Sequence, residues 1–371
     1  MNLTTEQCLE MVARRNINII LLHYNLTGRL SGRPRTGIPF LNMLFIILSL
    51  FIIVQNLIVL VALVRFLRLR RWVHCCLANI AFSDLLAGIS YLLNICLSGS
   101  TTFLLTPELW FLREGLLFTT LAASTFSLLV TAVERYSTMV VPMSESRTAK
   151  LIRVQGLIIL CWVMAAAVGS LPLVGWNCLC QIEQCSSLLP LYSRTYIVFS
   201  LGLLGITLLG IIGFYCTIYY FVCSSAKREL VTNQSRRSFH LLKTVLIILG
   251  CFVLCWSPLF IYLLVDAACS PPSCKSPLGL EWVLALAVLN SACNPLIYSL
   301  RSSEVRKAIL ALLCYACIHT GVRPPSCCQE ASEITSGSSN ESSIKRKSSV
   351  RLSRTMSFRS PVTSVSSVPS Q

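Results

Sequence analysis

The chain has 371 residues, of which 54% are hydrophobic and only 12% are charged. Soluble domains carry about 25% charged residues, and a mean hydropathy of +0.70 is difficult to accommodate on a surface exposed to water. The composition therefore excludes most soluble enzymes and predicts an integral membrane protein. The net charge of +16 fits the excess of basic residues on the cytoplasmic side of membrane proteins, so we expect no nucleic-acid partner.

Residues 1–39 form the predicted N-terminal tail. The first ten residues have neither a basic region nor an apolar core, so we expect no cleavable signal peptide. Asn2 and Asn25 each begin an Asn-x-Thr sequence. Such a sequence accepts a glycan only where the tail lies outside the cytoplasm, so both residues are candidate glycosylation sites of an extracellular tail.

Seven apolar segments follow, each near the length of about 20 residues that spans a bilayer as a helix. The sixth and seventh contain Pro258 and Pro295, which a membrane helix tolerates where neighbouring groups satisfy the freed carbonyl. We expect an all-α membrane protein with a seven-helix bundle over residues 40–300. The predicted spans are 40–64, 73–97, 110–139, 154–174, 196–223, 241–268 and 280–300.

The distribution of Lys and Arg predicts the orientation of the bundle. If the N-terminus is outside, the outer segments hold 8 of the 31 basic residues, and the other 23 lie on the inner side. Basic residues concentrate on the cytoplasmic side of membrane proteins. We therefore expect a multi-pass plasma-membrane protein with an extracellular N-terminus and a cytoplasmic C-terminus.

Two regions follow the last span. Residues 301–320 are expected to form a short amphipathic helix with apolar and basic side chains on opposite faces. Cys314 and Cys317 lie near its end, a position suited to palmitoylation. Residues 321–371 are rich in serine and basic residues, so we expect a disordered cytoplasmic tail that is either phosphorylated for regulation or simply solvated.

Asp84 is the one acidic residue deep inside a predicted span, and ionisable residues there are candidates for function. Asn56, Ser124, Asn290 and Asn294 lie on other spans at depths where they can converge with it. Together they would form a hydrated pocket for a small cation such as sodium. The alternative is a single structural hydrogen bond between helices. No other cofactor or metal is expected.

Three motifs mark the predicted helices: Glu-Arg-Tyr at 134–136, Cys-Trp-Ser-Pro at 255–258 and Asn-Pro-Leu-Ile-Tyr at 294–298. Glu134 and Arg135 can pair locally, and release of that pair would give the inner face two states.

The order and spacing of these motifs, with Asn56, segment 77–84 and Trp162, resemble rhodopsin-like G-protein-coupled receptors over about residues 40–317. The resemblance implies a receptor for heterotrimeric G proteins, of the inhibitory and twelve/thirteen classes, regulated by receptor kinases and arrestin. It also implies an activation switch of Glu134, Arg135, Tyr215, Trp256, Pro258, Asn294, Pro295 and Tyr298.

The extracellular cysteines depart from the usual family pattern. No cysteine lies at the outer end of the third span, whereas Cys178, Cys180 and Cys185 lie in the second outer loop. This arrangement is similar to the lysosphingolipid receptor branch, in which each outer loop is closed by its own disulfide. The resemblance implies the pairs Cys178–Cys185 and Cys269–Cys274, with Cys180 unpaired. Spacing alone does not choose between Cys178 and Cys180.

Arg113 and Glu114 are adjacent at the outer end of the third span. Consecutive helical residues point about 100° apart, so the guanidinium can bind a phosphate while the carboxylate binds an ammonium. A zwitterionic ligand would satisfy both, and the alternative is a local salt bridge. Apolar residues deeper in the bundle suit either helix packing or an alkyl chain: Leu117, Phe118, Leu121, Trp256, Leu259, Phe260, Leu263 and Leu284.

Segments 23–30 and 110–115 resemble sphingosine 1-phosphate receptors. That resemblance implies phosphate contacts from Tyr24 and Arg29, and head-group contacts from Asn94, Ser98 and Thr102. Receptors for lysophosphatidic acid carry Gln in place of Glu114, because their ligand has no ammonium. An unpaired buried carboxylate is costly, so Glu114 favours sphingosine 1-phosphate over lysophosphatidic acid, which is the alternative ligand.

Proteins of other classes fit less well. A transporter would show internal repeats or further deep ionisable groups, and a retinal protein would need a lysine within 280–300, where there is none. The four histidines lie outside the membrane core near no evident nucleophile, so we expect no enzymatic activity.

Overall fold

The computed structural model describes residues 8, 10, 18–26, 40–67, 69, 71–141, 146–186, 189–228, 234–268 and 279–319. Asn2, Arg29, Cys269, Cys274 and the tail 321–371 lie outside these residues, so their predicted roles are not addressed by the structure. The chain divides into two compact units, Met1–Ile309 and Leu310–Gln371. The fold and the sites below belong to the first unit, apart from Cys314 and Cys317, which belong to the second.

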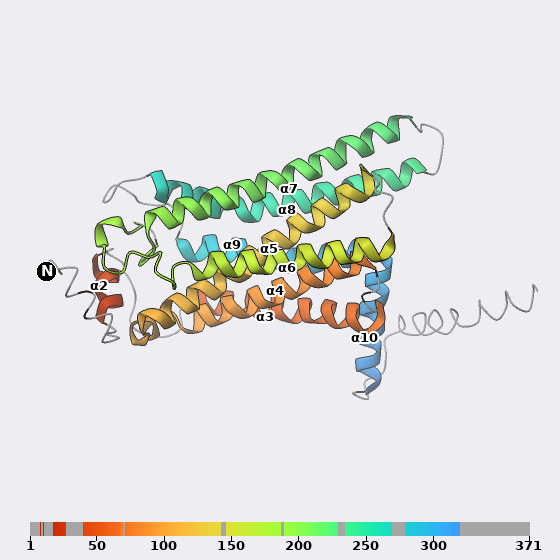
Figure 1. Ribbon diagram of the computed structural model, residues 1–371. Helices are drawn as coiled ribbons and strands as arrows, with labels where there is room; N and C mark the ends of the chain where they lie inside the picture. The colour runs from red at the N-terminus through yellow and green to blue at the C-terminus, as the bar shows by residue number, and fades with distance from the viewer. Residues whose placement is uncertain are drawn as a thin grey trace, which may run out of the picture. The chain divides into compact units, whose positions relative to one another are not determined.

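Seven helices of the described residues are long and apolar enough to cross a membrane, which confirms the predicted all-α class. A short helix follows the seventh (Figure 1). The helices are α2 (Asn18–Leu26), α3 (Phe40–Ala62), α4 (Trp72–Cys96), α5 (Pro107–Met139), α6 (Arg147–Ser170), α7 (Arg194–Arg228), α8 (Gln234–Ala268), α9 (Leu280–Arg301) and α10 (Ser303–His319). Shorter turns are η1 (Leu63–Leu67), η2 (Gly99–Leu104) and η3 (Ile182–Gln184).

Helix capping explains why two spans begin earlier than hydropathy predicts. In α5 the hydroxyl of Thr106 accepts a hydrogen bond from the Leu109 amide, and Pro107 occupies the first turn. In α6 the Ser146 hydroxyl accepts from the Ala149 amide at 3.2 Å. A side-chain cap and an N-terminal proline both favour helix initiation, so these helices extend beyond their apolar cores.

Most helices pack against the next one in the sequence, but α7 packs against α5 rather than α6, and α9 closes against α3 and α4. Helices α5 and α6 approach so closely that a Cβ atom added to Gly115 would lie 2.7 Å from the Gly169 carbonyl oxygen. Small residues permit such approach in membranes, where packing rather than hydrophobic burial holds helices together. This contact fixes the outer half of α5.

A polar connection ties α4, α5 and α6 together at mid-depth. Asn79 donates a hydrogen bond to the Ser127 hydroxyl at 2.7 Å, and the Trp162 indole donates to the Asn79 amide oxygen at 2.9 Å. Each polar group is satisfied by a neighbouring helix, as the membrane interior requires. In contrast, large apolar side chains such as Ile159 on α6 and Ile206 on α7 face outward, where lipid would contact them.

Candidate functional site

Arg113 and Glu114 are joined directly at the outer end of α5. The guanidinium donates to the Glu114 carboxylate through Nη2 at 2.6 Å and through Nε at 3.0 Å. Both side chains are largely buried. Arg113 and Glu114 thus form the local salt bridge, which was the alternative to ligand binding in the sequence analysis. The buried carboxylate is stabilised by the adjacent cation.

Polar residues from α4 and η2 complete this charge pair. Asn94 donates to Glu114 Oε1 at 2.9 Å, while Arg113 Nη1 donates to the Leu97 carbonyl at 2.7 Å and to the Thr102 hydroxyl at 3.1 Å. Two of the three predicted head-group residues on this side therefore contact the pair. Ser98 does not, because its hydroxyl donates to the Ile95 carbonyl in the last turn of α4.

Helix α2 lies at the same end of the bundle, beside η2 (Figure 1). Tyr24 on α2 is 8% exposed, and its ring packs edge-on against Phe103 with centroids 5.4 Å apart. Phe103 directly follows Thr102 in η2, and Thr102 binds Arg113. Tyr24 therefore lies close to the Arg113–Glu114 pair. Asn25, the candidate glycosylation site on α2, is exposed.

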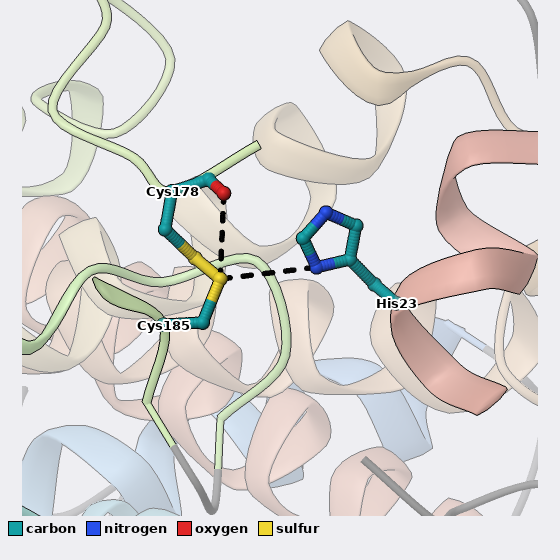
Figure 2. Close-up of side chains that lie close together, drawn as sticks. All are labelled: His23, Cys178 and Cys185. Atoms are coloured by element: carbon teal, nitrogen blue, oxygen red, sulfur yellow. Dashed lines mark hydrogen bonds between the residues drawn. A yellow bond between two sulfur atoms is a disulfide. The ribbon is translucent and has the colours of Figure 1, made fainter. Parts of the chain in front are cut away.

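His23 is a member of this region that sequence reasoning did not select. Its Nε2 lies 2.9 Å from the Leu179 carbonyl oxygen. Its Nδ1 faces the Cys185 sulfur at 3.9 Å, as Figure 2 shows. The ring is 2% exposed, and burial lowers the pKa of His23 from its ordinary value. A neutral imidazole therefore anchors α2 to the second outer loop. Its place inside segment 23–30 was the available signal.

Two disulfides organise the second outer loop. Cys178 is joined to Cys185, the pair that the family resemblance implies, and Cys8 is joined to Cys180. The expectation that Cys180 is unpaired is therefore wrong. Its partner lies 172 residues earlier in the chain, a separation that loop spacing cannot reveal. The second bridge links the N-terminal segment covalently to the loop that covers the bundle.

An aromatic cluster lies beneath that loop. Tyr192 stacks on Tyr196 with centroids 5.5 Å apart, and it meets Phe118 edge-on at 5.5 Å. The loop is further held by the Ser186 hydroxyl, which donates to the Asp266 carboxylate of α8 at 2.5 Å. Asp266 is buried at the outer end of α8, and sequence reasoning did not select it because it lies at the edge of its span.

Below the mouth, the predicted alkyl-chain residues come together in the core of the bundle. Most belong to the buried apolar cluster: Leu117, Leu121, Trp256, Leu259, Leu263 and Leu284. Phe118 packs against this cluster and Phe260 is partly buried. The structure thus shows them as core packing, and their role toward a lipid chain stays a prediction.

The polar cluster around Asp84 is assembled from three helices. The Ser124 hydroxyl donates to Asp84 Oδ1 at 2.7 Å, and the Asn294 amide donates to Oδ2 at 2.8 Å. Ser291, which sequence reasoning missed, donates to Oδ1 at 2.8 Å. Ser291 lies three residues before Asn294, so the two share a helix face. Asn290, four residues before Asn294, shares that face too, so spacing alone does not choose between them.

The two other predicted members are placed differently. Asn56 donates to the Ser291 carbonyl at 3.1 Å and does not bind Asp84. Asn290 is buried, but its amide nitrogen has no hydrogen-bond partner. The carboxylate and the hydroxyls of Ser124 and Ser291 supply oxygen atoms, which hard cations prefer, and binding of a small cation here stays a prediction.

The inner end of α5 differs from the predicted local pair. Glu134 is fully buried and accepts from Arg153 of α6 at 3.1 Å. Arg135 makes no ion pair with any described residue, and its Nε has no hydrogen-bond partner. Adjacent residues on a helix diverge, whereas α6 presents Arg153 directly to the carboxylate. Pairing of Glu134 with Arg135 was therefore the wrong expectation for this conformation.

The remaining switch residues lie inside the bundle. Arg135 is close enough to Tyr215 and Tyr298 for its charge to act on both hydroxyls. Trp256 is 3% exposed and contacts Phe252, and Pro258 and Pro295 lie within α8 and α9.

The palmitoylation candidates belong to α10. Cys314 is buried in this helix, and its palmitoylation stays a prediction. The side chain of Cys317 lies outside the described part of the chain.

Comparison with known proteins gives one consistent family. Residues 55–298 match the family model of the 7 transmembrane receptor (rhodopsin family). The chain is 50% identical to human sphingosine 1-phosphate receptor 4 over 98% of its length and 97% of the relative. It is 46% identical to mouse sphingosine 1-phosphate receptor 4, covering 99% and 97% of the two chains.

A relative of another subtype matches less of the chain. Sphingosine 1-phosphate receptor 3 of Takifugu rubripes is 43% identical over 81% of this chain and 79% of its own. The sequence segments 113–129 and 175–180 resemble type 4 receptors, in agreement with the human and mouse matches. These relatives are receptors and not enzymes. The chain belongs to the sphingosine 1-phosphate receptor branch of the rhodopsin family of seven-transmembrane receptors.

Proposed function

We propose that this chain is a plasma-membrane receptor that binds sphingosine 1-phosphate and activates heterotrimeric G proteins. The observation that carries the proposal is the buried Arg113–Glu114 pair at the outer end of the bundle, with Asn94 and Thr102 hydrogen-bonded to it. Named relatives that are sphingosine 1-phosphate receptors support the same ligand.

Binding would replace the ion pair between Arg113 and Glu114 by two ion pairs, one from each residue to the ligand. The phosphate takes the Arg113 guanidinium in bidentate fashion, and the ammonium takes the Glu114 carboxylate. Tyr24 and Arg29 of the N-terminal segment add to the phosphate contacts. A ligand with a phosphate but no ammonium would draw Arg113 away and leave Glu114 buried with only Asn94. Loss of a partner for a buried charge is strongly unfavourable, so the pair selects a zwitterion.

Activation is a shift between two states of the bundle, and the ligand must bind one of them more tightly. The alkyl chain of the ligand packs beside Trp256, and the sixth span pivots at Pro258. In the favoured state Arg135 faces Tyr215 and Tyr298. Asn294 and Pro295 lie beside the Asp84 cluster, where a sodium ion would stabilise one of the two states.

The orientation, with the N-terminus extracellular and the C-terminus cytoplasmic, rests on the distribution of basic residues. Inhibitory and twelve/thirteen G proteins, receptor kinases and arrestin are the partners that the family resemblance implies. Lysophosphatidic acid is the alternative ligand, since it shares the phosphate and the single chain.

The experiment measures G-protein activation in cells that express this chain and lack other lysophospholipid receptors. Sphingosine 1-phosphate is expected to activate it, and lysophosphatidic acid is not. Arg113→Ala should raise the half-maximal concentration at least 100-fold, while Glu108→Gln, an exposed change on the same helix, should leave it unchanged. If Arg113→Ala keeps a normal response at equal surface expression, the proposed phosphate contact is wrong.

A further inference from the structure

Three cysteines come together where α8 packs against α9. Cys251 and Cys255 lie four residues apart on α8, so their side chains share one face of that helix, and Cys293 lies on α9. The three sulfur atoms all lie within 4.8 Å of one another, and each thiol is close enough to hydrogen-bond the other two. All three are free cysteines. This thiol cluster therefore presents three sulfur ligands to one point of the bundle.

Single thiols elsewhere in the bundle have a simpler explanation. Cys216 and Cys223 are partly buried on α7, where a thiol packs as a small apolar side chain. Within the described residues, the other group of three close ligands is His23 with Cys178 and Cys185, whose two sulfurs are already joined to each other. The thiol cluster is thus the one such group in the described ranges whose sulfurs are free. The sequence analysis expected no such site, because the third sulfur belongs to a different span.

The spacing of the sulfurs suits a zinc ion. Zinc–sulfur bonds are about 2.3 Å long in a tetrahedral site, which places the sulfurs about 3.8 Å apart. Because the sulfurs start no more than 4.8 Å apart, they need to approach one another by at most about 1 Å, a shift within the reach of side-chain rotation. Three protein ligands leave the fourth position of zinc to a water molecule.

The ligand type and the membrane together select a soft divalent ion. Thiolates bind zinc and copper(I), whereas sodium, magnesium and calcium prefer oxygen ligands such as those around Asp84. The thiol cluster lies within two membrane-spanning helices, where uncompensated charge is unfavourable. Three thiolates leave two negative charges uncompensated around copper(I) but only one around zinc. Zinc is therefore the favoured occupant.

The thiol cluster is accessible to an ion. Cys255 is 5% exposed, but Cys251 and Cys293 are only partly buried. A metal site needs an entry path, and the two partly buried sulfurs provide one. Zinc takes thiolates, so each thiol that binds releases its proton to water as the zinc–sulfur bond forms.

We propose that Cys251, Cys255 and Cys293 bind a zinc ion that joins α8 to α9. The two ligands on α8 precede Pro258, and the ligand on α9 precedes Pro295. An ion held by both helices restrains the part of α8 before Pro258, which moves when the sixth span pivots. Zinc thus favours the inactive state. The zinc site does not depend on the proposed function, whereas this restraint rests on it.

The first test measures metal binding to the purified full chain in detergent, with a phosphine reductant that keeps the thiols reduced. A chromogenic chelator competes for zinc and reports its affinity. Cobalt(II) in place of zinc reports sulfur ligands through their charge-transfer absorption in the near ultraviolet. We expect a sulfur–cobalt band that saturates at one ion per chain and that calcium and magnesium do not reduce. Absence of the band would overturn the site.

Substitutions place the ion at the thiol cluster. Cys251→Ser with Cys293→Ser removes two ligands, and Cys293→Ser alone is the milder second variant. The matched control is Cys216→Ser with Cys223→Ser, which changes two partly buried thiols of α7. We expect at least tenfold weaker zinc binding and no sulfur–cobalt band in the first double variant, and less than a twofold change in the control.

Thermal unfolding without zinc is measured on each variant, so that zinc affinities are compared among folded proteins only. Equal zinc affinity in the two double variants would overturn the site, because binding would then not depend on the thiol cluster.

The restraint is tested by G-protein activation in membranes, with sphingosine 1-phosphate as the agonist and with or without saturating zinc. Zinc should lower the response of the wild-type chain at least threefold and that of the Cys251→Ser, Cys293→Ser variant less than twofold. If zinc binds through sulfur while sphingosine 1-phosphate gives no response, the proposed function is wrong and the zinc site stands. A normal response that saturating zinc leaves unchanged would overturn the restraint.

Discussion

At the scale of single residues, His23 shows how a titratable group is held in one protonation state. Its ring is buried between α2 and the second outer loop, with the Leu179 carbonyl at one nitrogen and the Cys185 sulfur near the other. Burial is the largest cause of its lowered pKa, and the carbonyl hydrogen bond only partly offsets it. The docked α2 therefore holds fewer protons than the undocked segment.

This arrangement predicts that α2 docks less tightly in acid. Raising the pH favours the state that binds fewer protons, which here is the docked state. Docking is therefore strongest above the ordinary histidine pKa of about 6.5. It weakens as the pH falls from 7.5 through 6.5 toward the docked pKa, by up to about tenfold per unit of pKa difference.

Hydrogen exchange of the α2 amides at pH 7.5 and 5.5, corrected for intrinsic rates, measures this change. His23→Gln keeps a hydrogen-bond donor but cannot titrate, so its α2 should show no change with pH beyond the intrinsic one. The same pH dependence in His23→Gln would assign the effect to another group.

The residue scale also shows what the sequence could not supply. The long apolar segments contain few polar groups, so the convergence of Asp84, Ser124 and Asn294 was predictable. Which of Asn290 and Ser291 binds Asp84 was not predictable, because it depends on how α9 is rotated about its axis. Similarly, residue types identified Arg113 and Glu114, but only the side-chain conformations show that they bind each other.

At the scale of helices, the Glu134–Arg153 ion pair connects α5 to α6. Arg153→Gln should lower the thermal stability, because it leaves the fully buried Glu134 carboxylate without its partner. A fully buried pair loses about 3–5 kcal/mol in such an experiment, and the loss here should be smaller because Arg153 is 29% exposed.

A double-mutant cycle with Glu134→Gln tests this pairing. The double variant should be more stable than Arg153→Gln alone, since neither charge then remains uncompensated. Additive losses from the two substitutions would show that the residues do not interact.

The contact of α5 with α6 gives a second prediction at this scale. Gly169→Ala should lower the melting temperature, because the new Cβ would meet the Gly115 carbonyl oxygen at 2.7 Å as well as Thr119, and helix backbones cannot yield as a flexible side chain can. Gly156→Ala on the same helix is the control, since nothing lies within 4 Å of its Cβ position. Equal melting temperatures for the two variants would contradict this account of the packing.

Helix number and approximate position were predictable from hydropathy, since each span needs about 20 apolar residues. The residues at which the helices begin and end were less predictable. Helix α8 starts at Gln234, seven residues before its predicted start, and α5 and α6 also begin earlier, because polar caps and polar first turns continue a helix beyond its apolar core. Hydropathy locates the segment inside the membrane and not the full helix.

At the scale of the whole molecule, the bundle carries functional candidates at its outer end and between two of its helices. The outer end holds a charge pair beneath a loop that two disulfides tie, one of them to the N-terminal segment. The contact between α8 and α9 holds the thiol cluster. The Cys8–Cys180 bridge was beyond sequence reasoning, because a contact across 172 residues follows only from the packing of α2 on the loop.

The central claim is that Arg113 and Glu114 together select a zwitterionic lysophospholipid. Competition binding of sphingosine 1-phosphate and lysophosphatidic acid to the wild-type chain and to Glu114→Gln tests it most directly. The substitution should weaken sphingosine 1-phosphate by roughly 10- to 150-fold, as expected for losing a charged hydrogen bond of about 1.5–3 kcal/mol, and should strengthen lysophosphatidic acid. An unchanged preference for sphingosine 1-phosphate in Glu114→Gln, at equal surface expression, would contradict the account.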